Sequence, residues 1–271
     1  MSYRLIQYDQ DDRGIVTITL NDPEAKNAVS PEMNEEIVAE IERVERDPAA
    51  RVLILTGAGR IFCSGGNIKR MVATGKVLEA PTSTVRDEMF PTEVGIRRVV
   101  LGLRKLSKPA IAAINGPAVG SGIGLAAGCD IRVIADTARL SWVFVRRGIV
   151  PDDASLALVQ QLIGYARAYE WGITGGTIDA ARAYEYGFVN HVVPADQLME
   201  HCRAIAIEII DNSPPLTVQA FKFVLSEATE QSIEESVRLT KQAQDVVSAT
   251  EDHREALRAY AEKRKPVWKG K

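Results

Sequence analysis

An unbroken run of apolar, mostly branched side chains at residues 52–56 constrains the fold more than any other segment. A run of this kind, ending at Gly57, is typical of a strand that is buried on both faces. Before it, residues 15–20 alternate as a strand, and residues 31–47 repeat apolar side chains at helical spacing after Ser30, a favourable helix cap. Strand, helix and strand in this order predict a βαβ-type layer.

The chain divides into two parts of different character. Strands and helices are mixed up to residue 197, and only helices are expected after it. We therefore predict a core over residues 1–197 and a helical region over residues 198–271 that packs on the core or on another subunit. The other elements expected are strands at residues 5–8, 110–114 and 131–135 and helices at residues 94–106, 154–163, 198–210, 216–228, 233–247 and 251–264.

Charge and composition argue against several classes of protein. The 33 Lys and Arg against 36 Asp and Glu give a net charge of -3, with no basic excess for a nucleic acid. Three cysteines without Cys-x-x-Cys spacing predict reduced thiols and no structural metal site. The charged amino terminus predicts no signal peptide, so we expect a cytoplasmic protein. Residues 109–129 carry no charge, yet their prolines and glycines favour a buried strand and helix over a membrane span.

Two glycine-rich turns carry the strongest chemical signal. The first spans residues 63–67, and the second spans residues 120–122, where it opens a helix. Small residues let a ligand approach the backbone, and the first amides of a helix point at whatever lies above them. Two amides converging on one point would form an oxyanion hole, and a purely structural role of the glycines is the alternative. A dinucleotide-binding turn is disfavoured, because no acidic residue stands about 20 positions further on.

Four motifs in order along the chain resemble the crotonase superfamily of enoyl-CoA hydratases and isomerases. They are TGAGRIFCSGGNIK at residues 56–69, KPAIAAINGPA at residues 108–118, GFV at residues 187–189, and EKRKP at residues 262–266. The resemblance covers nearly the whole chain.

The resemblance implies an α/β fold with a ββα spiral core and a helical carboxy-terminal region used in trimer assembly, often with two trimers stacked. It implies an acyl-CoA thioester as substrate, with coenzyme A as part of that substrate and no separate cofactor. It also implies that the thioester carbonyl accepts hydrogen bonds from the amides of Gly66 and Ser121, which would stabilise an enolate oxygen. The partners expected are therefore acyl-CoA and further copies of the chain, as a homotrimer or hexamer.

The resemblance also assigns positions to coenzyme A binding. Lys26 and Ala28 match an early loop that lines the pantetheine and phosphates, and Ser64, Asn67 and Ile68 match positions near the adenine. Asn67 stands where the family usually has Asp. A surface lysine without a role is the alternative for Lys26.

Departures from the hydratase pattern decide the expected reaction. Gly124 and Phe144 occupy the two positions at which hydratases of this superfamily carry glutamates, and neither side chain can move a proton. Asp152 stands where members that isomerise enoyl-CoA carry their acid/base residue, beside an apolar wall that includes Phe144. A carboxylate there could take a proton from one carbon and return it to another. The alternative is that Asp152 or Asp153 only caps the following helix.

We therefore predict an enoyl-CoA isomerase that stabilises an enolate at the amides of Gly66 and Ser121 and moves a proton with Asp152. One alternative is a hydratase that activates water through Asp152, Glu88 or Glu93. The others are a hydrolase of the same superfamily and a protein that binds acyl-CoA without catalysis.

Other reactive side chains are weaker candidates. His191, His201 and His253 lie outside both turns and lack metal-ligand spacing, so we expect surface or packing roles. Cys63 has no evident histidine partner and is expected to be a small buried thiol. The arginines at 146–147 are expected either to face solvent or to hold a polar acyl group.

Overall fold

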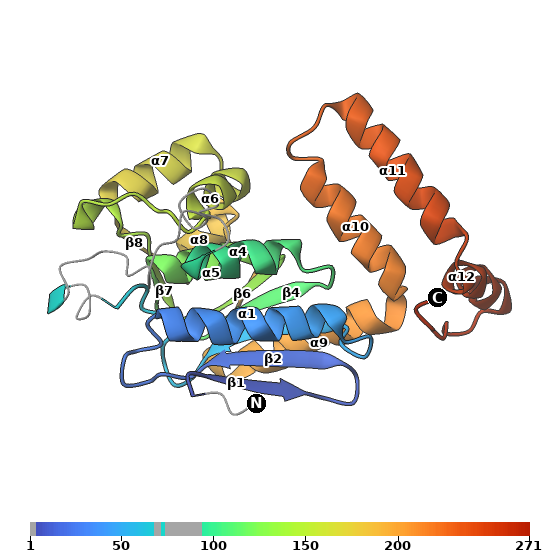
Figure 1. Cartoon of the computed structure of the whole chain (residues 1–271), viewed down its shortest axis with the longest axis horizontal. Helices are drawn as coiled ribbons and strands as arrows, with labels where there is room; N and C mark the ends of the chain where they lie inside the picture. Colours follow the sequence, from blue (N-terminus) through green and yellow to red (C-terminus); the bar gives the residue numbers. More distant parts are fainter. Residues whose placement is uncertain (1–3, 68–71, 74–93) are drawn as a thin grey trace.

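A six-stranded sheet forms the centre of the chain (Figure 1). The computed structural model describes residues 4–67, 72–73 and 94–271. Across the sheet the strands follow the order β1 (Ile6–Gln10), β2 (Ile15–Leu20), β3 (Val52–Gly57), β4 (Ala110–Ile114), β6 (Ile131–Ala135) and β9 (His191–Val193). The β1 and β2 strands pair antiparallel, and every later pair is parallel.

The βαβ layer predicted at the start of the chain is present. Helix α1 (Pro31–Arg46) joins β2 to β3, which run parallel with Ile15 opposite Val52. Ser30 caps the helix, because its side chain accepts a hydrogen bond from the Met33 amide at 3.2 Å. Every residue of β3 is buried, as an unbroken apolar run requires.

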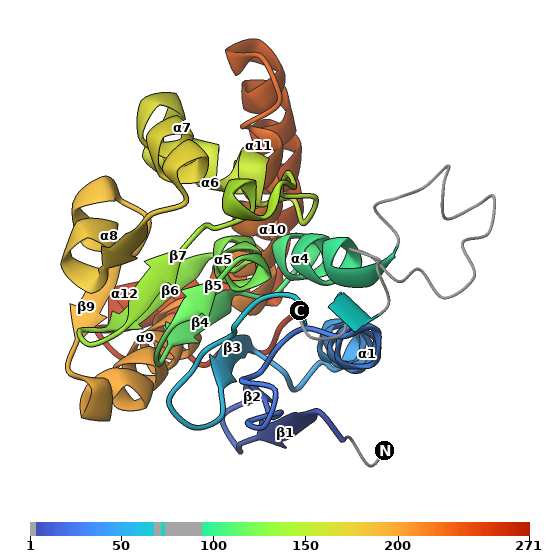
Figure 2. The same ribbon diagram turned by 90° about the vertical axis from the view of Figure 1, so that its left-hand side faces the viewer.

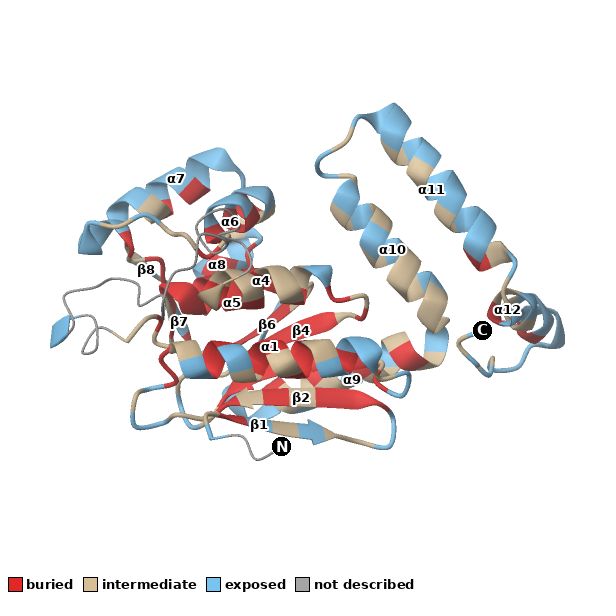
Figure 3. Cartoon of the chain, in the orientation of Figure 1, coloured by how far each residue is buried: buried red, intermediate tan, exposed pale blue. Residues whose placement is uncertain are grey.

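The uncharged segment at residues 109–129 forms the deepest part of the core. It contains β4 and helix α5 (Ser121–Gly128), in which all residues are buried (Figure 3). Helix α5 packs on helix α4 (Gly95–Lys105), and α4 in turn lies beside α1 (Figure 2). The approach is close, since a Cβ on Gly128 would lie 2.9 Å from the Val100 carbonyl oxygen. Within the described ranges, no helix is long and apolar enough to cross a membrane.

A second, three-stranded sheet was not predicted from the sequence. It contains β5 (Ala118–Val119), β7 (Arg139–Ser141) and β8 (Thr177–Asp179). Three short helices accompany it: α6 (Ser155–Ile163), α7 (Tyr165–Thr174) and α8 (Ala180–Tyr186). Trp142, which follows β7, donates to the Ser155 hydroxyl at 3.0 Å, so the start of α6 is fixed beside this sheet.

Four helices end the chain, as predicted. Helix α9 (Leu198–Asn212) packs against β3, β4 and β6, whereas α10 (Pro215–Glu227) and α11 (Ile233–Ser248) pack on each other away from the sheet (Figure 1). Helix α12 (Glu251–Glu262) is tied to the last residues of the chain, because the Asp252 carboxylate accepts hydrogen bonds from the amides of Lys269 and Gly270 at 2.7 and 2.8 Å.

Candidate active site

The candidate site lies where β3 and β4 end. Parallel neighbours end at the same edge of a sheet, so the two glycine turns that follow them start from one place. Asn115, directly after β4, holds the beginning of the loop that follows β3. Its amide nitrogen donates to the carbonyl oxygens of Gly57 and Gly59 at 2.8 and 3.0 Å, and its oxygen accepts from the Gly57 amide at 3.1 Å.

Asn27 holds the same loop from the opposite side, and sequence reasoning missed it. Its buried side chain donates to the carbonyl oxygens of Ala58 and Ile61 at 3.0 and 2.8 Å and accepts from the Asp22 amide at 3.0 Å. Its φ of 53° is left-handed, a conformation that asparagine tolerates better than most residues. No pattern around Asn27 indicates this role.

The two glycine turns are in direct contact. Cys63 exchanges backbone hydrogen bonds with the segment before α5, accepting from the Val119 amide at 2.9 Å and donating to the Pro117 carbonyl at 3.2 Å. Gly65 has a φ of 84°, and a Cβ placed there would lie 2.6 Å from the Val119 oxygen and 3.4 Å from the Ser121 nitrogen. Only glycine fits at this contact, because a side chain would push the turns apart.

Two backbone N–H groups at this contact lack acceptors. Within the described part of the chain, neither the Gly66 amide nor the Ser121 amide donates a hydrogen bond. Ser121 is the first residue of α5, where helical amides have no partner inside the helix. Two such donors beside one another can hold an oxygen that gains negative charge, and each is worth roughly 3 kcal/mol to a transition state.

Phe144 forms an apolar wall next to the second turn. Its ring atoms would lie 3.9 Å from a Cβ on Gly120, the residue before Ser121, and the side chain is 8% exposed. The Gly120 amide donates to the Ser141 carbonyl at 2.9 Å, which fixes the turn against β7. The turn that carries the Ser121 amide therefore has an aromatic ring on one side.

Asp152 is partly open to solvent and paired with a cation. Its carboxylate accepts a hydrogen bond from Arg97 of α4 at 2.8 Å, and the two side chains are 39% and 24% exposed. The pair joins α4 to the segment before α6. Asp152 does not cap α6.

The neighbouring Asp153 has the opposite surroundings. It is fully buried, and one carboxylate oxygen, Oδ1, accepts from the Ser155 amide at 3.1 Å at the start of α6. The other oxygen, Oδ2, has no partner among the described residues, and a Cβ on Gly124 of α5 would lie 2.6 Å from it. Burial raises the pKa of the Asp153 carboxyl group. The N-cap of α6 is Ala154, so neither aspartate occupies the cap position, although Asp153 accepts from the first amide of the helix.

The residues assigned to coenzyme A lie beside the first turn. Ser64 donates from its amide to the Lys26 carbonyl at 3.2 Å and from its hydroxyl to the Ala25 carbonyl at 3.3 Å. Lys26 is exposed, whereas Ala28 is buried. Asn67 is the last residue of this turn that the structure describes.

Three other residues weighed for the site, Ile68, Glu88 and Glu93, lie outside the described residues.

The weaker candidates take no part in this arrangement. Burial raises the pKa of the Cys63 thiol to about 12, so Cys63 is a protonated packing residue at neutral pH. His191 and His201 pack edge to face at 4.9 Å, on β9 and α9. Arg146 donates to the Thr174 carbonyl at 2.6 Å and covers the end of α7.

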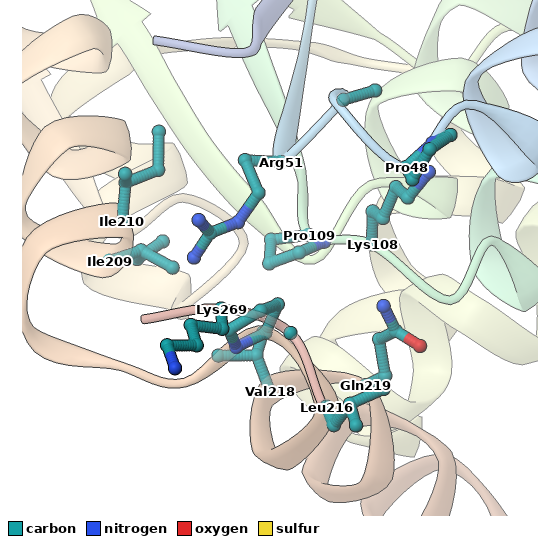
Figure 4. A pocket seen from close by; sticks show the side chains of 13 residues that line it. Pro48, Arg51, Lys108, Pro109, Ile209, Ile210, Leu216, Val218, Gln219 and Lys269 are labelled. Carbon is teal, nitrogen blue, oxygen red and sulfur yellow. The ribbon is translucent and has the colours of Figure 1, made fainter. Parts of the chain in front are cut away.

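A cavity of about 230 Å³ lies elsewhere (Figure 4). It is lined by Arg51 and Pro109, which precede β3 and β4, and by residues of α9 and α10 such as Ile209 and Leu216. It is thus at the opposite end of the strands from the glycine turns, about 20 Å away for a six-residue strand.

Comparisons with known proteins identify the fold and the family. The crystal structure of enoyl-CoA hydratase from Bacillus anthracis superposes with a TM-score of 0.89 at 32% identity, over 99% of this chain and 100% of that one. The fold is thus the crotonase fold, which the sequence resemblance implied.

The chain belongs to the enoyl-CoA hydratase/isomerase family, whose model matches residues 10–271. It is 31% identical to 1,2-epoxyphenylacetyl-CoA isomerase of Escherichia coli K12 over 96% of this chain and 97% of the relative. It is also 31% identical to an enoyl-CoA isomerase/hydratase of Mycosarcoma maydis, over 95% of this chain and 93% of the relative. Enzymes of this family act on acyl-CoA thioesters.

Proposed function

We propose that this enzyme moves the double bond of an enoyl-CoA thioester and that Asp152 is its acid/base residue. The observation that carries the proposal is the pair of acceptor-free amides at Gly66 and Ser121, at the contact of the two glycine turns. A thioester oxygen bound there would be stabilised as an enolate, the intermediate that double-bond migration requires.

The proposed reaction converts a 3-enoyl thioester to the 2-enoyl thioester. Asp152 removes a proton from C2, and the electron pair of the C2–H bond passes into the thioester, leaving a dienolate whose oxygen accepts from both amides. A proton is then delivered to C4, the carbonyl re-forms, and the double bond lies between C2 and C3. Atoms and charge balance without a further reactant.

Binding of the coenzyme A part is proposed for the loop that carries Lys26 and Ala28 together with Ser64, Asn67 and Ile68. The hydrogen bonds that join Ser64 to the backbone of residues 25–26 support a shared surface. Phe144 would contact the acyl chain. Coenzyme A belongs to the substrate, and the reaction needs no separate cofactor or metal.

Hydration is the second candidate. The relatives include proteins named as hydratases and one named as both, and a carboxylate beside an enoyl group could activate water instead of moving a proton. The residues at the two hydratase glutamate positions, Gly124 and Phe144, favour isomerisation.

The test is incubation of the protein with 3-enoyl- and 2-enoyl-CoA in heavy water. Double-bond migration with deuterium uptake is expected, and Asp152→Asn should abolish both. The matched control is Asp196→Asn, an exposed aspartate on the short helix before α9. A hydroxyacyl product would establish hydration, release of free coenzyme A would establish a hydrolase, and binding without turnover would establish a binding protein.

Assembly as a homotrimer or a pair of trimers stays a prediction. Large apolar side chains on α10 and α11, Phe221, Phe223 and Val237 among them, are more than half exposed in the single chain, which supports contact with further copies (Figure 3). The mass in solution tests it.

A further inference from the structure

The buried carboxyl group of Asp153 has one oxygen that no described residue contacts by a hydrogen bond, an arrangement that the fold alone does not require. The contact with the start of α6 uses only Oδ1, through the Ser155 amide. An uncharged acceptor such as a serine hydroxyl caps a helix equally well. Burying a carboxyl group with an unsatisfied oxygen costs folding free energy. The hydrogen bond to the Ser155 amide alone does not explain why an aspartate stands at position 153.

The unpartnered oxygen lies beside the first turns of helix α5. A Cβ on Gly124 would lie 2.6 Å from it, and Gly124 follows Ser121 by three residues in α5, or about 4.5 Å along the helix axis. The oxygen therefore lies against the helix whose first residue carries one of the two amides, and the missing side chain at Gly124 leaves room for it.

Asp152 and Asp153 are consecutive carboxyl groups in contrasting environments. Asp152 is partly solvated and accepts a hydrogen bond from Arg97. Asp153 is buried, no cation of the described residues pairs with it, and burial raises its pKa. Two carboxyl groups whose surroundings differ in this way can divide the roles of base and acid.

We propose that Asp153 is the proton donor of the reaction, with Asp152 as the base. This proposal rests on the proposed function. Asp152 takes the C2 proton, and the dienolate forms against the two amides. The Asp153 O–H bond breaks, its proton joins C4, and the double bond moves to C2–C3. A proton passed from Asp152 to Asp153 restores the starting state.

With two carboxyl groups, removal of the C2 proton and delivery of a proton to C4 become separate events, which one residue that carried the same proton would couple. Removal of the C2 proton needs Asp152 and the amides, whereas completion of the migration needs Asp153. In heavy water, deuterium at C2 of recovered 3-enoyl-CoA measures the first event, and formation of 2-enoyl-CoA measures both.

The experiment compares wild type with Asp153→Asn and Asp153→Ser, which keep an acceptor for the Ser155 amide. Isomerisation is expected to fall at least 100-fold, the usual scale for loss of a general acid, while C2 exchange stays within a few-fold of wild type. Unchanged isomerisation, or equal loss of exchange and isomerisation, would overturn the role of Asp153 and leave the proposed function standing. Absence of exchange and migration in wild type would refute the proposed function itself.

A second variant keeps the test independent of the Asp153 substitutions. Gly124→Ala places a methyl group 2.6 Å from the Asp153 oxygen and must displace the carboxyl group. Isomerisation should again fall while exchange persists. The control is Gly102→Ala in α4, where the new Cβ would lie 3.5 Å from Ile41, an ordinary contact. Equal isomerisation rates in the two alanine variants would contradict the proposal.

Discussion

Arg97 donates a hydrogen bond to Asp152 over 2.8 Å, although 55 residues separate them in the chain. The contact orients the carboxylate that follows the Phe144 wall and ties α4 to the start of α6. An ion pair that is partly exposed contributes little to stability, so its main effect is on the position of Asp152.

Arg97→Gln should therefore impair turnover more than folding. Without the guanidinium group the Asp152 carboxylate is no longer held in one orientation, and misplacement of a reacting group by about 1 Å can cost up to about 100-fold in rate. We expect kcat for 3-enoyl-CoA to fall about tenfold or more, with the unfolding temperature nearly unchanged. Arg98→Gln is the control, because Arg98, the next residue of α4, pairs with Glu42 of α1 at 2.8 Å and not with Asp152. If both variants keep wild-type kcat, Arg97 does not position Asp152.

Asn27→Ala should weaken both the fold and the site. It removes three hydrogen bonds from a fully buried position and leaves the carbonyl groups of Ala58 and Ile61 without a donor. Orphaned buried groups cost about 1–3 kcal/mol each, so unfolding in urea should show a loss of at least about 2 kcal/mol. Asn212→Ala, which removes one exposed hydrogen bond at the end of α9, should cost far less. Equal losses in the two variants would show that Asn27 does not hold the loop.

The stability of wild type and Asp153→Asn should diverge with pH. Burial raises the folded-state pKa of Asp153 above its ordinary value of 3.8, so the folded chain binds more protons than the unfolded chain between these two values. This contribution to stability is complete below pH 3.8 and is lost as pH rises through the folded-state pKa. The amide of the variant does not titrate. Urea unfolding at a series of pH values should therefore show the advantage of wild type over the variant shrinking as pH rises, and parallel curves would be the contrary result.

Long elements were predictable from the sequence because their own residues specify them. The strands at residues 15–20, 110–114 and 131–135 match β2, β4 and β6, and the four carboxy-terminal helices begin within one residue of their expected positions. Strands β5, β7, β8 and β9 escaped prediction. Each has only two or three residues, too few for a period, and forms because a partner is already in place.

The site was predictable only in part for a similar reason. The glycine turns were recognisable because small residues after buried strands signal close approach of backbones, and the fold brings them together. Which of two adjacent aspartates faces inward was not readable, because Arg97 and Gly124 decide it from distant parts of the chain. Asn27 gave no local signal for its role, since the two carbonyl groups that it holds, at Ala58 and Ile61, are more than 30 residues away.

The two acceptor-free N–H groups belong to the main chain, so no change of side chain other than to proline deletes them. Mutational scanning that trims one side chain at a time would report positions 66 and 121 as tolerant while leaving their donors intact. A substitution at Gly65 would displace those donors, because the absence of a β-carbon at this residue lets the two glycine turns touch. Inheritance of this site therefore depends on the absence of a side chain at Gly65.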